Sequence, residues 1–305
     1  MLENFISSII SKKAKIQSFL KPNGKNLLLT HQSCLDGRAC DLVARKVFSN
    51  LICVKLPASN QDFFLEHYDL SRFDAIIMAD LSTNSPLILN RRNFIMIDHH
   101  ETSIGYTGNF VFHSEEKCGS YLLKTFLETA LDVDLSSLNT FLDYVNDYDT
   151  WEKKIEDSSL LEHLFRVYPW QRFQDRFGAF DGTFTDEERE IYAEEQKRLQ
   201  NVWDGLTIHV DGHCMVVLSE NFNNDLCERI FQKTKTINVV IWVWFPFGGS
   251  IRLRGGKEAI FSVGEYLKSA GLGGGHRKAG GFRINSNQTL EGVVEKIKND
   301  LKGIE

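Results

Sequence analysis

Aspartate and histidine residues recur at three places in the first hundred residues, each time at or close behind the end of an apolar run. They are His31 and Asp36 in HQSCLDG, Asp80 after FDAIIMA, and Asp98, His99 and His100 after NFIMI. Crowded carboxylates repel one another unless a cation lies among them. A mixed set of carboxylate and imidazole ligands suits Mn²⁺ or Mg²⁺ better than a thiolate-type zinc site does. The pattern therefore predicts a divalent-metal site, and such a site can activate water for hydrolysis.

The apolar runs indicate the elements that position these residues. Near-continuous apolar segments alternate with helical ones, such as the segment from Asp36 to about Asn50, which is typical of a parallel sheet with helices on both faces. Ligands of open parallel sheets bind outside the carboxyl ends of the strands, so the acids and imidazoles should meet at one edge. The predicted strands are Lys25–Thr30, Leu51–Leu56, Phe73–Ala79 and Asn93–Ile97.

Single residues of this set also have plain structural interpretations. His31 alone is typical of a hydrogen-bonded loop histidine, and Asp80 alone could cap the helix that follows it. Joint placement at three strand ends is harder to explain in this way, and it favours the metal site.

The remaining chain predicts a second domain. Helices are expected over residues 1–20, where the apolar spacing is helical, and over Cys118–Leu131 and Ser137–Asn146. The acidic segment 185–203 indicates a solvated helix between domains. Beyond it, Val239–Phe245 and Ser250–Arg254 resemble strands, and Gly271–Phe282 resembles a glycine-rich loop. We expect an α/β domain over residues 1–184, a helical linker over 185–205 and a smaller α/β domain over 206–305.

Composition limits the class of protein. The 305 residues carry a net charge of −6, which argues against binding long duplex nucleic acid through bulk positive charge. Six cysteines without a CxxC pair indicate reduced thiols in a cytoplasmic protein. The amino terminus lacks the features of a signal peptide, and no apolar stretch is long enough for a membrane span, so no membrane association is expected.

The motifs resemble those of the DHH phosphoesterase superfamily. "IDHH" after a buried strand, "AD" after the preceding one and "H…DG" after the first resemble its catalytic domain. "SIRLRG" followed by "GLGGGHRKAGGF" is similar to the DHH-associated domain. The resemblance covers residues 25–282 and implies a parallel-sheet DHH domain with helices on both faces and a smaller α/β domain.

This resemblance also implies roles for the residues of the first domain. Two ions are implied, with Mn²⁺ as the expected metal and Mg²⁺ as the alternative. His31 would bind one ion and Asp36 and His99 the second, while Asp80 would bridge the two, Asp98 would support the site and His100 would face the phosphate. A further aspartate ligand is expected from VNDYDTW, where Asp149 resembles the family motif better than Asp147 does. The other aspartate would act as a cap or hydrogen-bond acceptor.

One position departs from the family pattern. Many members carry two aspartates two residues apart in the first motif, and Cys34 stands at the place of the first. A thiol is a poor ligand for Mn²⁺ or Mg²⁺ unless it is deprotonated. Three interpretations follow: a more weakly held first metal, a site that accepts a softer ion, or a plain small loop residue.

The second domain is expected to bind the substrate. Gly274 and Gly275 can present backbone N–H groups to a phosphate, and Arg252 and His276 add directed donors. Glycines in such a segment otherwise simply form turns.

The expected function is metal-dependent hydrolysis of phosphodiester bonds in short single-stranded oligonucleotides, similar to the nanoRNases of the family. Two alternatives are a phosphatase acting on a small nucleotide such as adenosine 3′,5′-bisphosphate, and a nucleotide-binding protein with a weakened metal site. A homodimer is compatible with the sequence.

Overall fold

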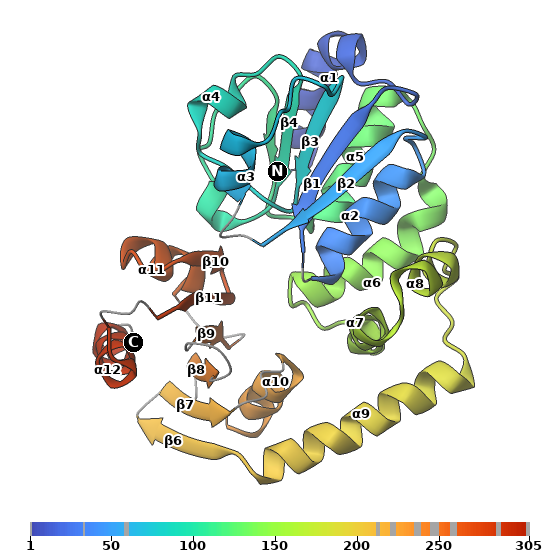
Figure 1. The fold of residues 1–305 in the computed structure, drawn as a ribbon. Coiled ribbons are helices and arrows are strands. Elements are labelled where there is room, and N and C mark those ends of the chain that lie inside the picture. The colour runs from blue at the N-terminus through green and yellow to red at the C-terminus, as the bar shows by residue number, and fades with distance from the viewer. Residues whose placement is uncertain are drawn as a thin grey trace. The chain divides into compact units, whose positions relative to one another are not determined.

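A computed structural model of the chain describes residues 2–32, 34–57, 61–211, 214–219, 224–234, 239–244, 250–256, 261–284 and 288–302. The chain divides into two compact units, Met1–Arg189 and Glu190–Glu305 (Figure 1).

The first unit is built on a five-stranded parallel sheet. Its strand order is β2-β1-β3-β4-β5, and every neighbouring pair is parallel. The strands are β1 (Asn26–His31), β2 (Leu51–Leu56), β3 (Ala75–Ala79), β4 (Phe94–Asp98) and β5 (Val111–His113). Four of them match the predicted strands to within two residues at either end.

Helices cover both faces of this sheet, as Figure 1 shows for α3 and α4 on one side and for α2 and α5 on the other. The α-helices are α1 (Leu2–Phe19), α2 (Leu35–Arg45), α3 (Gln61–His67), α4 (Pro86–Leu89), α5 (Gly119–Leu131), α6 (Asn139–Asp149), α7 (Ser158–Val167) and α8 (Trp170–Phe177). Two short 3₁₀ helices, η1 (Glu101–Ser103) and η2 (Ser136–Leu138), connect them. The helix predicted from Asp36 ends earlier than expected, at Arg45.

Burial on both faces explains the apolar runs of the strands. Alternate side chains of a strand point to opposite faces. On one face, side chains of β1, β3 and β4 form a buried cluster with residues of α3 and α4; the strand residues in it are Leu27, Leu29, Ile76, Met78, Phe94 and Met96. The strand residues that point to the other face are equally buried: Leu28, Ile77, Ile95 and Ile97. The predicted parallel sheet with two covered faces is confirmed.

The second unit contains a mixed six-stranded sheet. Its order is β10-β11-β9-β8-β7-β6; only β7 and β8 pair in parallel. The long helix α9 (Asp186–Asp204) leads into this unit. The strands are β6 (Thr207–Asp211), β7 (Cys214–Ser219), β8 (Val239–Trp244), β9 (Ser250–Gly255), β10 (Gly274–His276) and β11 (Ala279–Arg283), and the helices are α10 (Asn224–Lys233), α11 (Val263–Ser269) and α12 (Leu290–Leu301).

The prediction of a loop over Gly271–Phe282 is wrong, because most of this segment forms the antiparallel pair β10 and β11. The glycines let this pair lie close to α11. A Cβ on Gly280 would lie 2.5 Å from Leu267 Cδ1, and one on Gly264 would lie 2.6 Å from the Gly275 carbonyl oxygen. Glycine has a low intrinsic preference for strands, which is why the sequence predicted a loop here. Packing against α11 decides the conformation of this segment instead.

The predicted strand over Val239–Phe245 matches β8, although Phe245 lies outside the described residues. Within the described part of the chain, every helix is too short or too polar to cross a membrane.

Candidate active site

The carboxyl ends of the parallel strands collect the predicted site residues. β1 ends in His31, Asp80 follows β3, and Asp98 ends β4. The strand order reverses between β1 and β3, because β1 lies between β2 and β3. A crevice at such a reversal is the usual ligand site of open parallel sheets. The sheet therefore delivers these side chains to the place where a ligand is expected.

The imidazole of His99 lies among three carboxylates. Its Nε2 atom is 3.4 Å from Asp80 Oδ1, 3.5 Å from Asp149 Oδ2 and 3.8 Å from Asp36 Oδ2. All four residues are buried or nearly so, and Asp149 Oδ2 has no hydrogen-bond partner. Four possible ligand atoms converge in this way from separate elements, and one of them accepts no hydrogen bond. Such a group matches the ligand set of a divalent cation.

The charges of this group are unbalanced. Burial and the charges of Asp36 and Asp80 raise the pKa of Asp149 to about 8. Burial and Asp80 also raise the pKa of Asp36. Burial alone would lower the pKa of His99, but the hydrogen bond to Asp80 and the neighbouring carboxylates raise it to about 10. The raised pKa values of Asp36 and Asp149 show that three acidic groups are crowded around a single imidazolium. The residues therefore fit a divalent cation, whose positive charge would favour their carboxylate forms.

A second cluster lies on the other side of the Asp80 carboxylate. The Cys34 thiol donates to Asp80 Oδ2 at 3.1 Å and lies 3.0 Å from Nδ1 of His31. Asp80 thus directs Oδ1 to His99 and Oδ2 toward the cluster of His31 and Cys34. A carboxylate with one oxygen toward each cluster has the arrangement that a ligand shared by two ions requires.

Cys34 has a structural function at this position. Its side chain caps α2 by accepting a hydrogen bond from the Gly37 N–H at 3.2 Å. Burial and the charge of Asp80 raise the pKa of the thiol well above its usual range. In this arrangement Cys34 is a neutral thiol that acts as a cap and a donor.

The amino end of α5 holds Asp36. The Gly119 N–H donates to Asp36 Oδ2 at 2.7 Å and the Ser120 N–H to Oδ1 at 2.9 Å. A Cβ on Gly119 would lie 2.8 Å from Asp80 Cβ and 3.0 Å from Asp36 Oδ2, so glycine is needed for this close approach. Sequence reasoning missed these residues, although the Gly-Ser pair at the start of a predicted helix was a signal for anion-binding amides.

Asp98 and His100 form a pair beside the carboxylates. His100 Nδ1 lies 2.7 Å from Asp98 Oδ1, and His113 Nε2 lies 3.0 Å from the His100 carbonyl oxygen. Burial would raise the pKa of Asp98, but the charge and hydrogen bond of His100 hold it well below its usual range. The pair orients the His100 ring, whose side chain is 24% exposed. His113 was not identified from the sequence.

The two aspartates of VNDYDTW have different surroundings. Asp149, the last residue of α6, points to His99 as described above. Asp147 accepts a hydrogen bond from the Lys154 N–H at 2.7 Å, and so fixes the loop that follows the helix. This placement favours Asp149 as the ligand and leaves Asp147 as a hydrogen-bond acceptor.

Asp80 has an unusual backbone. Its φ is 58°, in the left-handed region that few residues other than glycine, asparagine and aspartate adopt readily. Residues other than glycine with a left-handed backbone are uncommon, and they cluster at functional sites. The turn after β3 thus aims the Asp80 side chain between the two clusters.

The second unit places its predicted substrate-binding residues on β9 and β10, the two strands that flank β11 in the sheet. Arg252 of β9 is paired with Gly281 of β11, and a Cβ on Gly281 would lie 2.7 Å from Arg252 Cδ. Gly274 and Gly275 pair with Gly281 and Gly280, and His276 pairs with Ala279. The Arg252 side chain therefore lies against Gly281, at a place that a larger residue in position 281 would occupy.

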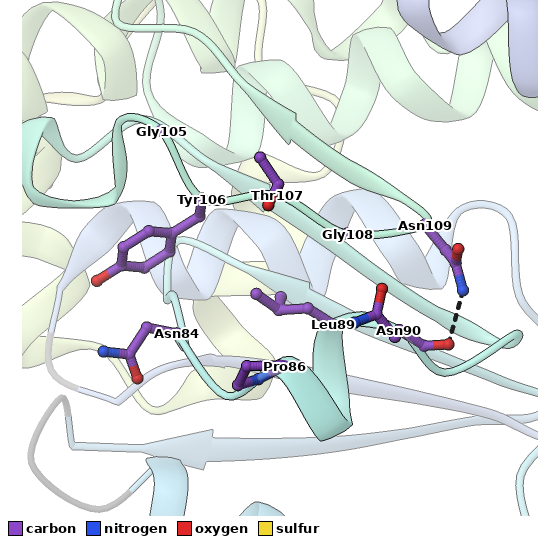
Figure 2. A pocket seen from close by; sticks show the side chains of 9 residues that line it. All are labelled: Asn84, Pro86, Leu89, Asn90, Gly105, Tyr106, Thr107, Gly108 and Asn109. Carbon is purple, nitrogen blue, oxygen red and sulfur yellow. Dashed lines mark hydrogen bonds between the residues drawn. The ribbon is translucent and has the colours of Figure 1, made fainter.

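The first unit has a cavity of about 520 Å³. Figure 2 shows the side chains that line it. It lies between the loop that follows β3 and the loop that precedes β5, and none of its nine lining residues is charged. Tyr106 is half-buried there, and burial and the Asp98 charge raise its pKa. The lining residues are Asn84, Pro86, Leu89, Asn90, Gly105, Tyr106, Thr107, Gly108 and Asn109. The candidate metal ligands are not among them, so this cavity is distinct from the cluster of acids.

Comparison with known proteins gives one similar sequence of named activity. No family model matches the chain. The chain is 23% identical to oligoribonuclease NrnB of Bacillus subtilis (strain 168) in an alignment of 312 positions, which covers 87% of this chain and 75% of that protein.

Solved structures share the fold at low sequence identity. RecJ of Thermus thermophilus in complex with Mn²⁺ matches with a TM-score of 0.57 and 15% identity, over 97% of this chain and 54% of RecJ. The pGpG-specific phosphodiesterase PggH of Vibrio cholerae matches with a TM-score of 0.55 and 12% identity, over 92% of this chain and 98% of PggH. The sequence similarity to NrnB and the fold shared with RecJ and PggH agree with the resemblance of the motifs to the DHH superfamily of phosphoesterases.

Proposed function

We propose that this protein is a divalent-metal-dependent phosphodiesterase that hydrolyses short oligonucleotides. The observation that carries the proposal is the position of His99 among Asp36, Asp80 and Asp149, with the second oxygen of Asp80 directed to Cys34, beside His31. Two groups of ligand atoms with a shared carboxylate suit a two-metal hydrolase.

The residues present would hold Mn²⁺ or Mg²⁺ as follows. His31 and Asp80 would bind one ion, and Asp36, Asp80, His99 and Asp149 the other. When bound, such ions lower the pKa of water and neutralise charge on the oxygens of a phosphoryl group.

The remaining residues would position the substrate and move protons. Asp98 holds the His100 ring through Nδ1, and Nε2 of the same ring would donate a hydrogen bond or a proton to the phosphoryl group or its leaving oxygen. The amides of Gly119 and Ser120 keep Asp36 in place while the substrate binds and leaves. In the second unit, Arg252, His276 and the Gly274-Gly275 backbone would supply donors to the phosphates of the substrate.

The names of the relatives support a short nucleic-acid substrate. NrnB is named as an oligoribonuclease and PggH as a pGpG-specific phosphodiesterase. The net charge of −6 agrees with a short substrate, because a long polyanion requires an extended positive surface.

The test is a hydrolysis assay on 5′-labelled RNAs of two to ten nucleotides, with Mn²⁺ or with a chelator. We expect metal-dependent release of mononucleotides, fastest for the shortest RNAs, and a loss of at least about 100-fold in Asp80→Asn. Asparagine tolerates the left-handed backbone, so this variant should keep its fold. Asp69→Asn, an exposed aspartate of the same unit, is the control and should keep full activity. Wild-type cleavage by Asp80→Asn, or no cleavage of any length by the native protein, would refute the proposal.

A further inference from the structure

A second pocket, of about 370 Å³, lies on the first unit between α1 and the segments that lead into β4 and β5. Arg92 precedes β4 and Phe110 precedes β5, so the pocket is at the amino ends of the strands. The candidate active site is at their carboxyl ends. About 16 Å of strand separates the two along β4. The lining residues are Lys12, Lys15, Ser18, Phe19, Arg92, Asn109 and Phe110.

Three cationic side chains and no acid line this pocket. Among the described residues, no ion pair includes Lys12, Lys15 or Arg92, whereas the neighbouring Lys13 pairs with Asp132. Burial lowers the pKa of Lys12, and repulsion from Lys15 lowers it further. Unpaired cations that converge on a concave surface of an acidic protein (net charge −6) favour an anionic ligand.

An aromatic surface adjoins the cations. The rings of Phe19 and Phe110 are 5.2 Å apart at an angle of 59°, and both line the pocket. Lys12 Nζ lies 5.2 Å from the centre of the Phe112 ring. Asn109, which donates to the Asn90 carbonyl oxygen in Figure 2, also lines this pocket and adds a polar amide at its edge. A flat ring can pack against phenylalanine while an amide contacts its polar edge.

We propose that this pocket is a binding site for a nucleoside monophosphate, separate from the active site. The phosphate lies among Lys12, Lys15 and Arg92, and the base packs on Phe19 and Phe110. The volume is at the lower end of the range of about 300–1,000 Å³ for small-molecule sites, which suits a mononucleotide better than an oligonucleotide. The proposal does not depend on the catalytic assignment.

The test is equilibrium binding of adenosine 5′-monophosphate to the full chain in the presence of a chelator, so that metal-dependent binding at the active site is suppressed. Adenosine and inorganic phosphate are measured in parallel. The variant Lys15→Gln/Arg92→Gln removes two cations of the pocket. The control Lys13→Gln/Lys21→Gln removes the same charge from the same part of the chain, outside the pocket.

We expect saturable binding of the nucleotide that is at least about tenfold tighter than that of adenosine or phosphate. Lys15→Gln/Arg92→Gln should weaken it at least about tenfold, whereas the control and Asp80→Asn should bind as the native protein does. Absence of saturable binding, equal loss in both double variants, or loss in Asp80→Asn would overturn the proposal. Affinity that rises with oligonucleotide length would assign the surface to a polynucleotide and would also overturn it.

Discussion

Cys34 is the residue at which this chain departs most clearly from the motifs of the DHH superfamily, which it resembles. In the structure the sulfur of Cys34 caps α2 by accepting from the Gly37 N–H, and its S–H donates to Asp80. The second interaction requires a protonated thiol rather than a thiolate. Serine can make the same two hydrogen bonds. Cys34 is therefore better explained as a cap and a donor than as a ligand for a soft metal.

We predict that Cys34→Ser keeps activity and metal affinity within a few-fold of the native protein. Cys34→Ala should lose the cap and about 1 kcal/mol of unfolding free energy. Denaturant unfolding and metal titration of both variants are the measurements. If Cys34→Ser bound Mn²⁺ ten times more weakly while keeping its stability, the sulfur would be a ligand after all.

Asp147 and Asp149 allow a matched comparison two residues apart. Asp149→Ala should weaken metal binding and lower activity by at least about 100-fold, because its Oδ2 atom belongs to the group around His99. Asp147→Ala should lower the unfolding free energy by about 1–2 kcal/mol, because the Lys154 N–H loses its acceptor, with a much smaller effect on activity. Metal titration and thermal unfolding of the two variants separate the roles, and the reverse pattern would exchange the assignments.

At the scale of elements, the parallel sheet followed from the sequence because strands buried on both faces carry unbroken apolar runs. The short strand β5 was not predicted from the sequence, because three residues are too few to show a pattern of apolar side chains. The pair β10 and β11 was missed because its conformation depends on contacts with α11. The same limit applied at the site: Asp36, Asp80 and His99 could be identified by type and by strand end, whereas the Gly119 and Ser120 amides and His113 arrive from elsewhere in the fold.

The start of α9 is fixed by Glu188. The Glu188 N–H donates to Thr185 Oγ1 at 3.2 Å, and Glu188 Oε2 accepts from the Thr185 N–H at 2.8 Å, which forms a capping box. Arg176 of α8 donates to both carboxylate oxygens. Burial would raise the pKa of Glu188, but these hydrogen bonds lower it.

This arrangement predicts a pH-dependent contribution to stability. A lowered pKa stabilises the folded state above the unfolded-state pKa of about 4.3, and this contribution is lost as the pH falls through the lower folded value. Glu188→Gln should therefore cost about 1–3 kcal/mol at pH 7, and the difference from the native protein should shrink below pH 4. Urea unfolding across this range tests it, with the exposed neighbour Glu187→Gln as control. A difference that stays constant with pH would contradict the prediction.

At the scale of the whole molecule, all predicted metal ligands lie in the first unit. A ligand that binds only the folded state stabilises it by about 2.7 kcal/mol at a concentration of 100 times its Kd. For a unit of this size we expect Mn²⁺ to raise the unfolding temperature by roughly 5–10 °C.

Calorimetry of the native protein with Mn²⁺ and with chelator is the measurement. Only the transition of the first unit should move, and Asp80→Asn should abolish the shift. A shift of equal size in Asp80→Asn would place the metal elsewhere in the chain.

The left-handed backbone of Asp80 restricts which side chains evolution can sample there. Glutamate offers the same charge, but its backbone does not adopt this conformation readily; glycine adopts it and offers no oxygen. Asparagine adopts this conformation, keeps the shape of the carboxylate and removes its charge. A single-nucleotide change converts an aspartate codon into an asparagine codon. A lineage that lost catalysis at this position would therefore tend to pass through a folded, intact protein, which could persist as a nucleotide receptor.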